Sequence, residues 1–183
     1  MRWIGCVLLT WLLGTVSAQE YRPAPEAIRK VLDVPPAPTV RLVPGGQFVL
    51  LAQARGLPPV ADLARPYLRL AGLRIDPRND GPRLPPRYRS FRLVALAGKG
   101  KAVDYPFPKT GQPGLPEFSP DGSRFALTLT EDDGIALLLG TTSDGQTRRV
   151  PGVRLNAVLG DPIHWLAGGK QIVVTLTPPR CRS

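Results

Sequence analysis

Hydrophobic and polar residues alternate along most of this chain, and a period of two predicts β-strands. The clearest stretch is 117–150, in which Asp-Gly pairs separate four short runs: EF, RFALTLT, GIALLLG and QTRRV. In RFALTLT, Phe125, Leu127 and Leu129 should face one side of a sheet and the residues between them the other. GIALLLG is apolar at nearly every position, which is typical of a strand covered on both faces. Because Asp-Gly suits tight turns, the stretch predicts a four-stranded antiparallel sheet.

Similar runs flank this stretch. TVRLV and QFVLLAQA enclose Pro44-Gly45-Gly46, which predicts a hairpin. YLRLAGLRI predicts one further strand, in which Gly72 suggests a bulge or a close backbone approach, and SFRLVAL predicts another. Between these two runs, residues 76–90 form a proline-rich segment that we interpret as a loop outside the core. Only EAIRKVLDV, after Pro25, predicts a helix, which the following PPAP should end.

The turns also indicate a weak internal repeat. LVPGGQFVLLA, FSPDGSRFALTL and HWLAGGKQIVVTL each place a glycine turn before a strand, and Gly46, Gly122 and Gly169 are 76 and 47 residues apart. A β-propeller blade takes about 40 to 50 residues, so the second interval fits one blade and the first fits a blade with a long Pro/Arg-rich insertion at about 55–90. The predicted fold is therefore all-β, an incomplete β-propeller of about three blades that occupies 19–183.

The first eighteen residues have the pattern of a signal peptide. Arg2 precedes the apolar run Trp3–Leu13, and the small residues Val16-Ser17-Ala18 suit cleavage before Gln19. The apolar run is shorter than the roughly 18 residues that a membrane span needs. We therefore expect a secreted or periplasmic protein that meets the membrane only during export. Export would leave Cys181 as the one cysteine, which excludes an internal disulfide.

The chain is strongly basic, with 24 Lys and Arg against 14 Asp and Glu and a net charge of +10. Much of this charge lies in the insertion. This segment has no helix for the major groove and offers only Tyr67, Tyr88 and Phe91 among its prolines for stacking, so no nucleic-acid partner is expected. The arginines of this segment are Arg55, Arg65, Arg69, Arg74, Arg78, Arg83, Arg87, Arg89 and Arg92.

Residues for catalysis are scarce. The chain has no Gly-x-Ser-x-Gly motif, and Ser143 fits a turn better than a nucleophile. His164 is the one histidine, and its place in a strand pattern suggests packing. One histidine and one mature cysteine cannot supply a zinc site. The acidic run at 131–133 should be a solvated turn. No catalytic residue, metal or cofactor is therefore expected.

Three segments together resemble a known family. They are YRPAPEAIRKVLDVPPAP at 21–38, LPPVADLARPYLRLAGLRIDP at 57–77 and LNAVLGDPIHWLAGGKQIVVTLTPP at 155–179. In this order they resemble the amino-terminal part of the glutamyl-endopeptidase-like branch of the prolyl oligopeptidase family of serine peptidases, including its secreted bacterial members. SPDG at the start of a blade is shared with TolB-type propellers and separates the two groups poorly.

The resemblance implies a propeller that restricts peptide access to the active site of a separate α/β-hydrolase domain, whose Ser, Asp and His form the triad. That domain is missing here, so we expect a truncated, non-catalytic fragment whose partners are the peptide substrate and a hydrolase domain. Arg65, Arg69 and Arg74 are candidates for contact with an acidic substrate side chain, with solvated loop arginines as the alternative. A self-standing exported TolB-like binding module is the alternative function, and an enzyme with a site of its own is disfavoured.

Overall fold

The computed structural model describes residues 23–96, 102–105 and 110–178, so the predicted signal peptide and Cys181 lie outside the described residues. The described residues are mostly in short strands, and the strands pair in antiparallel sheets. This confirms the all-β prediction. Within the described ranges, no helix is both long and apolar enough to cross a membrane. The chain divides into two units, 1–34 and 35–183.

The first unit contributes one short helix, α1 (Glu26–Leu32), at the predicted place. The carbonyl oxygen of Pro25 accepts the N–H groups of Ile28 and Arg29, both at 3.0 Å, which starts the first turn. The helix ends at Asp33, just before the prolines that cannot continue it. None of its residues is buried.

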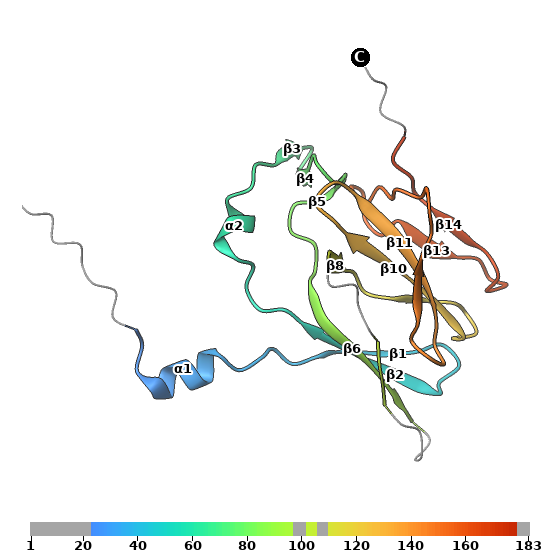
Figure 1. Cartoon of the computed structure of the whole chain (residues 1–183), viewed down its shortest axis with the longest axis horizontal. Helices are drawn as coiled ribbons and strands as arrows, with labels where there is room; N and C mark the ends of the chain where they lie inside the picture. The colour runs from blue at the N-terminus through green and yellow to red at the C-terminus, as the bar shows by residue number, and fades with distance from the viewer. Residues whose placement is uncertain (1–22, 97–101, 106–109, 179–183) are drawn as a thin grey trace, which may run out of the picture. The chain divides into compact units, whose positions relative to one another are not determined.

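The second unit begins with a four-stranded sheet in the order β1-β2-β6-β7. Its strands are β1 (Thr39–Leu42), β2 (Phe48–Ala54), β6 (Tyr88–Ala95) and β7 (Val103–Asp104), and Figure 1 shows β1, β2 and β6 side by side. β1 and β2 form the predicted hairpin, in which Gly45 and Gly46 both have positive φ. The run predicted as SFRLVAL lies within β6 except for Leu96, which follows its last residue.

The second sheet is the predicted meander. It follows the order β12-β11-β10-β8, with β9 also paired to β10. The strands are β8 (Gln112–Pro113), β9 (Glu117–Phe118), β10 (Arg124–Thr130), β11 (Ile135–Thr141) and β12 (Thr147–Arg149). A third, two-stranded sheet pairs β13 (Ile163–Trp165) with β14 (Ile172–Val174).

The second sheet lies between two hydrophobic cores. Phe125, Leu127 and Leu129 pack toward the first sheet, whereas Ala126 belongs to the core shared with the third sheet. The residues of β11 alternate between the two cores in the same way. Ala136 and Leu138 belong to the core shared with the first sheet, whereas Ile135 and Leu137 belong to the core shared with the third, and all four are buried. Both sequence predictions for these strands are thus confirmed. The three sheets follow one another face to face in chain order.

The three turns that join β1 to β2, β9 to β10 and β13 to β14 share one hydrogen-bond pattern. In each turn, a residue donates its N–H to the carbonyl of the residue five positions later and accepts the N–H of the glycine three positions later, at 2.8 to 3.0 Å. The glycines are Gly46, Gly122 and Gly169, with φ of 68°, 70° and 64°. The internal repeat seen in the sequence is therefore a repeat of backbone geometry. The starting residues are Val43, Ser119 and Leu166.

The insertion between β2 and β6 folds into α2 (Val60–Leu63) and a three-stranded sheet of β3 (Leu68–Leu70), β4 (Leu73–Asp76) and β5 (Gly81–Pro82). Two predictions were wrong here. YLRLAGLRI forms a hairpin instead of one bulged strand, because Ala71 and Gly72 both take positive φ, 45° and 85°, and reverse the chain. The segment 76–90 also contributes to the interior: Asp76 and Asn79 are buried, and Tyr88 packs against the first core.

Candidate functional site

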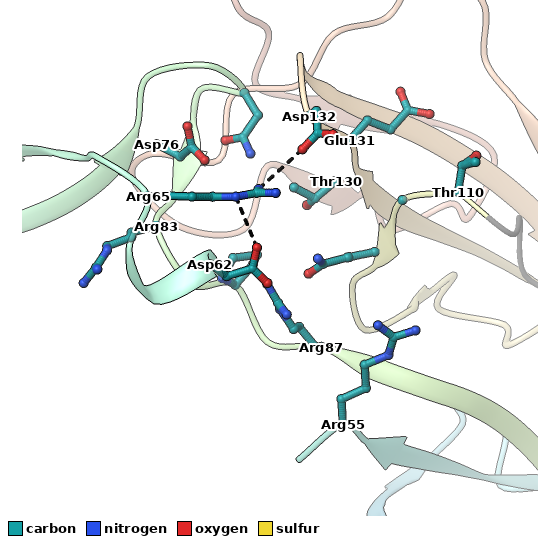
Figure 2. A pocket seen from close by; sticks show the side chains of 14 residues that line it. Arg55, Asp62, Arg65, Asp76, Arg83, Arg87, Thr110, Thr130, Glu131 and Asp132 are labelled. Atoms are coloured by element: carbon teal, nitrogen blue, oxygen red, sulfur yellow. Dashed lines mark hydrogen bonds and ion pairs between the residues drawn. The ribbon is translucent and has the colours of Figure 1, made fainter. Parts of the chain in front are cut away.

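A polar cavity of about 430 Å³ lies between the insertion and one end of the second sheet (Figure 2). Four guanidinium groups and four carboxylates line it, and Thr110, Gly111 and Gln112 complete the side formed by the second sheet. Because the opposite charges are equal in number, the cavity carries no net formal charge. The charged residues are Arg55, Arg65, Arg83, Arg87, Asp62, Asp76, Glu131 and Asp132.

Asp62 is the centre of the ion-pair network. Pro59 precedes α2, and this one-turn helix directs Asp62 into the interior, where the residue is 8% exposed. One carboxylate oxygen accepts a hydrogen bond from Arg87 at 2.6 Å, and the other pairs with Arg65 at 3.2 Å. A charge this far from water needs such partners, so both arginines hold the buried carboxylate in place.

Arg65 also reaches across the cavity to the second sheet. Its guanidinium contacts Asp132, in the turn after β10, at 3.4 Å, and Figure 2 shows both of its ion pairs as dashed lines. Neighbouring Glu131 makes a bidentate pair with Arg149 at 2.8 and 2.9 Å. The acidic run at 131–133 was predicted to be a solvated turn, but two of its three carboxylates make ion pairs.

Two further ion pairs support the wall formed by the insertion. Arg78 holds Asp76 through bonds of 3.0 and 2.5 Å, and this hydrogen bonding lowers the pKa of the Asp76 carboxyl below its usual value. Arg154 pairs with Asp80 at 3.3 Å and donates to the carbonyl of Arg78 at 3.0 Å. The wall is therefore fixed to the rest of the unit by polar contacts.

The lining of the cavity is polar and contains no imidazole. None of its fourteen lining residues is serine, cysteine or histidine, so a nucleophile paired with an imidazole base is absent from this cavity. Arg55 has no ion-pair partner within the described ranges, and Arg83 stacks on the ring of Tyr67 at 4.0 Å. These two arginines are the lining cations without a carboxylate partner.

Of the three arginines predicted from the sequence to contact substrate, only Arg65 lines the cavity. Arg69 and Arg74 are directly opposite each other on β3 and β4, and both are exposed. Arg69 donates two hydrogen bonds to the hydroxyl of Tyr67, at 3.2 and 2.7 Å. The structure thus brings Arg69 and Arg74 together on the hairpin and places Arg65 separately, in ion pairs with Asp62 and Asp132.

Sequence reasoning missed Arg87 and Asp62, the least exposed ion pair of the cavity. They are 25 residues apart, so no helix or strand period in the sequence relates them. The one available signal was Asp62 itself, a single aspartate in a short segment that follows Pro59. Ser143 lies in a turn, as predicted. His164 was predicted to be a packing residue, but it is exposed on β13 because its neighbours, Ile163 and Trp165, face the core instead.

No protein-family model matches the chain. Two curated plant proteins are similar to it, and both bear the name probable glutamyl endopeptidase, chloroplastic. The protein from rice is 27% identical over 169 residues, which cover 85% of this chain and 18% of the rice protein. The protein from Arabidopsis thaliana is 48% identical over 56 residues, or 31% of this chain and 6% of that protein.

These similarities relate the chain to proteins named as peptidases. The chain spans less than a fifth of the length of either relative. The similarity to the rice protein nevertheless extends over most of the chain, so it is not confined to one short motif.

Proposed function

We propose that this chain is an amino-terminal β-propeller portion of a serine peptidase of the prolyl oligopeptidase family, glutamyl-endopeptidase-like branch. The similarity to the rice protein over 85% of the chain carries this proposal. In this role the chain performs no chemistry. It shapes the route by which peptides reach a catalytic hydrolase domain, and the predicted signal at 1–18 directs it to the periplasm or the cell exterior.

The repeated sheets support the propeller part of the proposal. Three sheets pack face to face in chain order, and each opens with the same turn. Blades of a propeller have this relation to their neighbours, because each blade buries its faces against the blades beside it. β1, β9 and β13 would be the first strands of three successive blades.

The composition of the cavity supports a non-catalytic role. Its four carboxylates all make ion pairs, which suits a rigid wall that orders the insertion more than it suits a reaction centre. Within the peptidase, Arg69 and Arg74 remain proposed contacts for an acidic substrate side chain. Arg65 is proposed as a further contact through the cavity.

A chimaeric enzyme tests the function. Residues 23–178 of this chain would replace the matching segment of the rice protein, and hydrolysis of a short glutamyl peptide would be compared with hydrolysis of a folded protein substrate. We expect the short peptide to be cleaved and the folded protein to be excluded, as in the unmodified rice protein. A stable chimaera that cleaves both substrates would contradict the gating role. Cleavage of the peptide by this chain alone would contradict the non-catalytic role.

The proposed arginine contacts have their own test in the same chimaera. Arg65→Gln, Arg69→Gln and Arg74→Gln would be combined, and the ratio of cleavage after Glu to cleavage after Ala would be measured. A lower ratio is expected if these guanidinium groups meet the acidic side chain. Arg29→Gln is the matched control, because Arg29 is exposed on α1, outside the insertion. An unchanged ratio in the triple variant would exclude the three arginines as specificity residues.

A further inference from the structure

Three arginines follow one another across the small sheet of the insertion. Arg69 on β3 is directly opposite Arg74 on β4. Arg83 follows β5, and its N–H donates to the carbonyl of Arg74 at 2.9 Å, which continues the same ladder. Residues that are opposite each other in an antiparallel ladder project from the same side of the sheet, and adjacent strands are about 4.8 Å apart. The three guanidinium groups, which we call the arginine row, therefore lie on one face.

The arginine row is not balanced by carboxylates. Among the described residues, none of its three guanidinium groups makes an ion pair with aspartate or glutamate. Arg78 and Arg87, elsewhere in the insertion, each pair with a buried aspartate. Like charges that are directly opposite each other destabilise a sheet. An anionic group on this face would therefore relieve a repulsion between the three arginines.

Tyr67 lies against the arginine row and has a side chain that can carry such a group. Its hydroxyl oxygen accepts hydrogen bonds from two nitrogens of the Arg69 guanidinium, at 3.2 and 2.7 Å. The guanidinium of Arg83 stacks over the tyrosine ring, 4.0 Å from its centroid. The Tyr67 side chain is half-buried. The phenol is thus held by two members of the row.

These contacts also change the acidity of the phenol. The hydrogen bond from Arg69 lowers the pKa of the Tyr67 phenol below its usual value, and the positive charges of the row act in the same direction. The phenolate is the nucleophilic form of a phenol, so its population at neutral pH is raised. Tyr105 differs, because its burial raises the pKa of its phenol. The surroundings of Tyr67 therefore favour reaction at its oxygen.

We propose that Tyr67 is a modification site, at which the phenol oxygen accepts a sulfuryl or phosphoryl group and the arginine row binds the resulting ester anion. The co-reactant is an activated sulfate or phosphate donor, whose negative charge the row attracts. The phenol oxygen forms a bond to the sulfur or phosphorus atom of the donor. The bond from that atom to the leaving oxygen breaks with its electron pair, and the phenolic proton passes to solvent.

The ester would supply the negative charge that the row lacks. Its terminal oxygens would accept charge-assisted hydrogen bonds from Arg69 and Arg74, as esters of tyrosine do at clusters of arginine. All the residues of this site belong to the insertion, and the site is separate from the ion pairs of Asp62. The proposal does not rest on the proposed peptidase function, and its tests require no hydrolysis of a peptide.

The first test encodes sulfotyrosine at position 67 of the full chain and measures the thermal midpoint. We expect the midpoint to rise by roughly 2 to 4 °C, because new charge-assisted hydrogen bonds form. Arg69→Gln with Arg74→Gln should abolish this rise. Arg29→Gln with Arg89→Gln removes two other exposed arginines and should preserve it.

A second position and a second ester complete this test. Sulfotyrosine in place of Tyr88 should lower the midpoint, because Tyr88 packs against the first core and a charge there would be poorly solvated. Phosphotyrosine at position 67 distinguishes the two esters, since its second ionisation lies near pH 6 and the sulfate ester stays a monoanion. A greater rise with phosphotyrosine than with sulfotyrosine at pH 7.5, lost by about pH 5, would assign the site to phosphoryl transfer. An equal or smaller rise would assign it to sulfuryl transfer.

The second test measures the nucleophilicity of the phenol. The full chain is treated with 4-(fluorosulfonyl)benzoate, an anionic probe whose sulfur bonds to a phenol oxygen as fluoride leaves. Peptide mapping then compares the four tyrosines of the chain. We expect Tyr67 to react first, and Arg69→Gln should slow its labelling roughly three- to tenfold. Uncharged benzenesulfonyl fluoride should show a smaller preference for Tyr67, because the row does not attract it.

Two results would overturn the proposal. The first is a thermal midpoint that neither ester at position 67 raises, or that rises equally when Arg69 and Arg74 are replaced. The second is labelling of Tyr67 no faster than labelling of Tyr88, the other half-buried tyrosine. Either result would show that Tyr67 and the arginine row are an ordinary solvated cluster.

Discussion

No side chain can be accommodated at Gly122, because a β-carbon there would overlap the carbonyl oxygen of Pro44 in the preceding repeated turn. The third repeated turn is close to the second as well, because a β-carbon on Gly169 would lie 3.6 Å from a carboxylate oxygen of Asp121. The three repeated turns are therefore close neighbours. Their contact sets how the second sheet is placed on the first.

Substitution of Gly122 by alanine should destabilise the chain more than substitution of Gly46. Both glycines have φ near +70°, so each alanine incurs backbone strain of about 1 kcal/mol. A β-carbon on Gly46 would meet no atom within 4 Å, whereas one on Gly122 would collide with Pro44 and add about 1 to 3 kcal/mol. Urea unfolding of both variants measures the difference in the free energy of unfolding. Equal losses would contradict the close contact between the turns.

Truncations in the two cores should both be costly, because the second sheet is covered on both faces. Leu127 and Leu155 are each 0% exposed and belong to different cores. We expect Leu127→Ala and Leu155→Ala each to lower the free energy of unfolding by about 2 to 5 kcal/mol. Leu42→Ala is the matched control, since Leu42 is 64% exposed on β1, and should cost less than about 1 kcal/mol. A small effect of Leu155→Ala alone would show that the third sheet packs loosely.

The sequence predicted the meander well because local and long-range signals agree there. The period of two in β10 places Phe125 and Ala126 on opposite faces, and both faces are buried. The apolar composition of β11 indicated the same two-sided cover. The Asp-Gly turns between these strands are short, so they predicted antiparallel pairing of each strand with the next, as observed for β10, β11 and β12.

The insertion was less predictable because tertiary contacts decide its structure. Ala71 takes positive φ, a conformation that alanine disfavours, so the residue types around it indicated the β3–β4 hairpin only weakly. The burial of Asp62 depends on ion pairs with Arg65, three residues later, and with Arg87, 25 residues later. Charge counts identified an arginine-rich segment but could not tell which arginines had partners.

The turn at Asp121 should make stability depend on pH in the acidic range. Hydrogen bonds from Ser119 and Ser123 lower the pKa of the Asp121 carboxyl from 3.8 to about 2. The carboxylate thus stabilises the folded state above about pH 4, and this contribution is lost as the pH falls toward 2. The thermal midpoint of Asp121→Asn should therefore change less over this range than that of the unmodified chain.

Asp133→Asn is the control for this measurement, because it removes an exposed turn carboxylate that accepts no hydrogen bond from the residues that the structure describes. Its thermal midpoint should follow that of the unmodified chain from pH 4 to 2. If both variants flatten the profile equally, total charge controls the acid response and the serine hydrogen bonds do not.

The Arg87–Asp62 pair should be the most sensitive ion pair of the insertion. Each side chain is 11% exposed, and the two are joined at 2.6 Å. Arg87→Gln leaves a carboxylate poorly solvated and should cost about 3 kcal/mol. Arg92→Gln, which breaks the exposed pair with Asp104, should cost less than about 1 kcal/mol.

The double variant Asp62→Asn with Arg87→Gln distinguishes a pair that stabilises from one that is merely costly to break. It removes both charges, so its loss should be smaller than the sum of the two single losses, and urea unfolding of all three variants measures the coupling. Additive losses would mean that Arg87 orders the insertion through packing of its side chain. Arg65 would then be left as the partner that neutralises Asp62, and the link from α2 to Asp132 would become the main electrostatic support of the cavity.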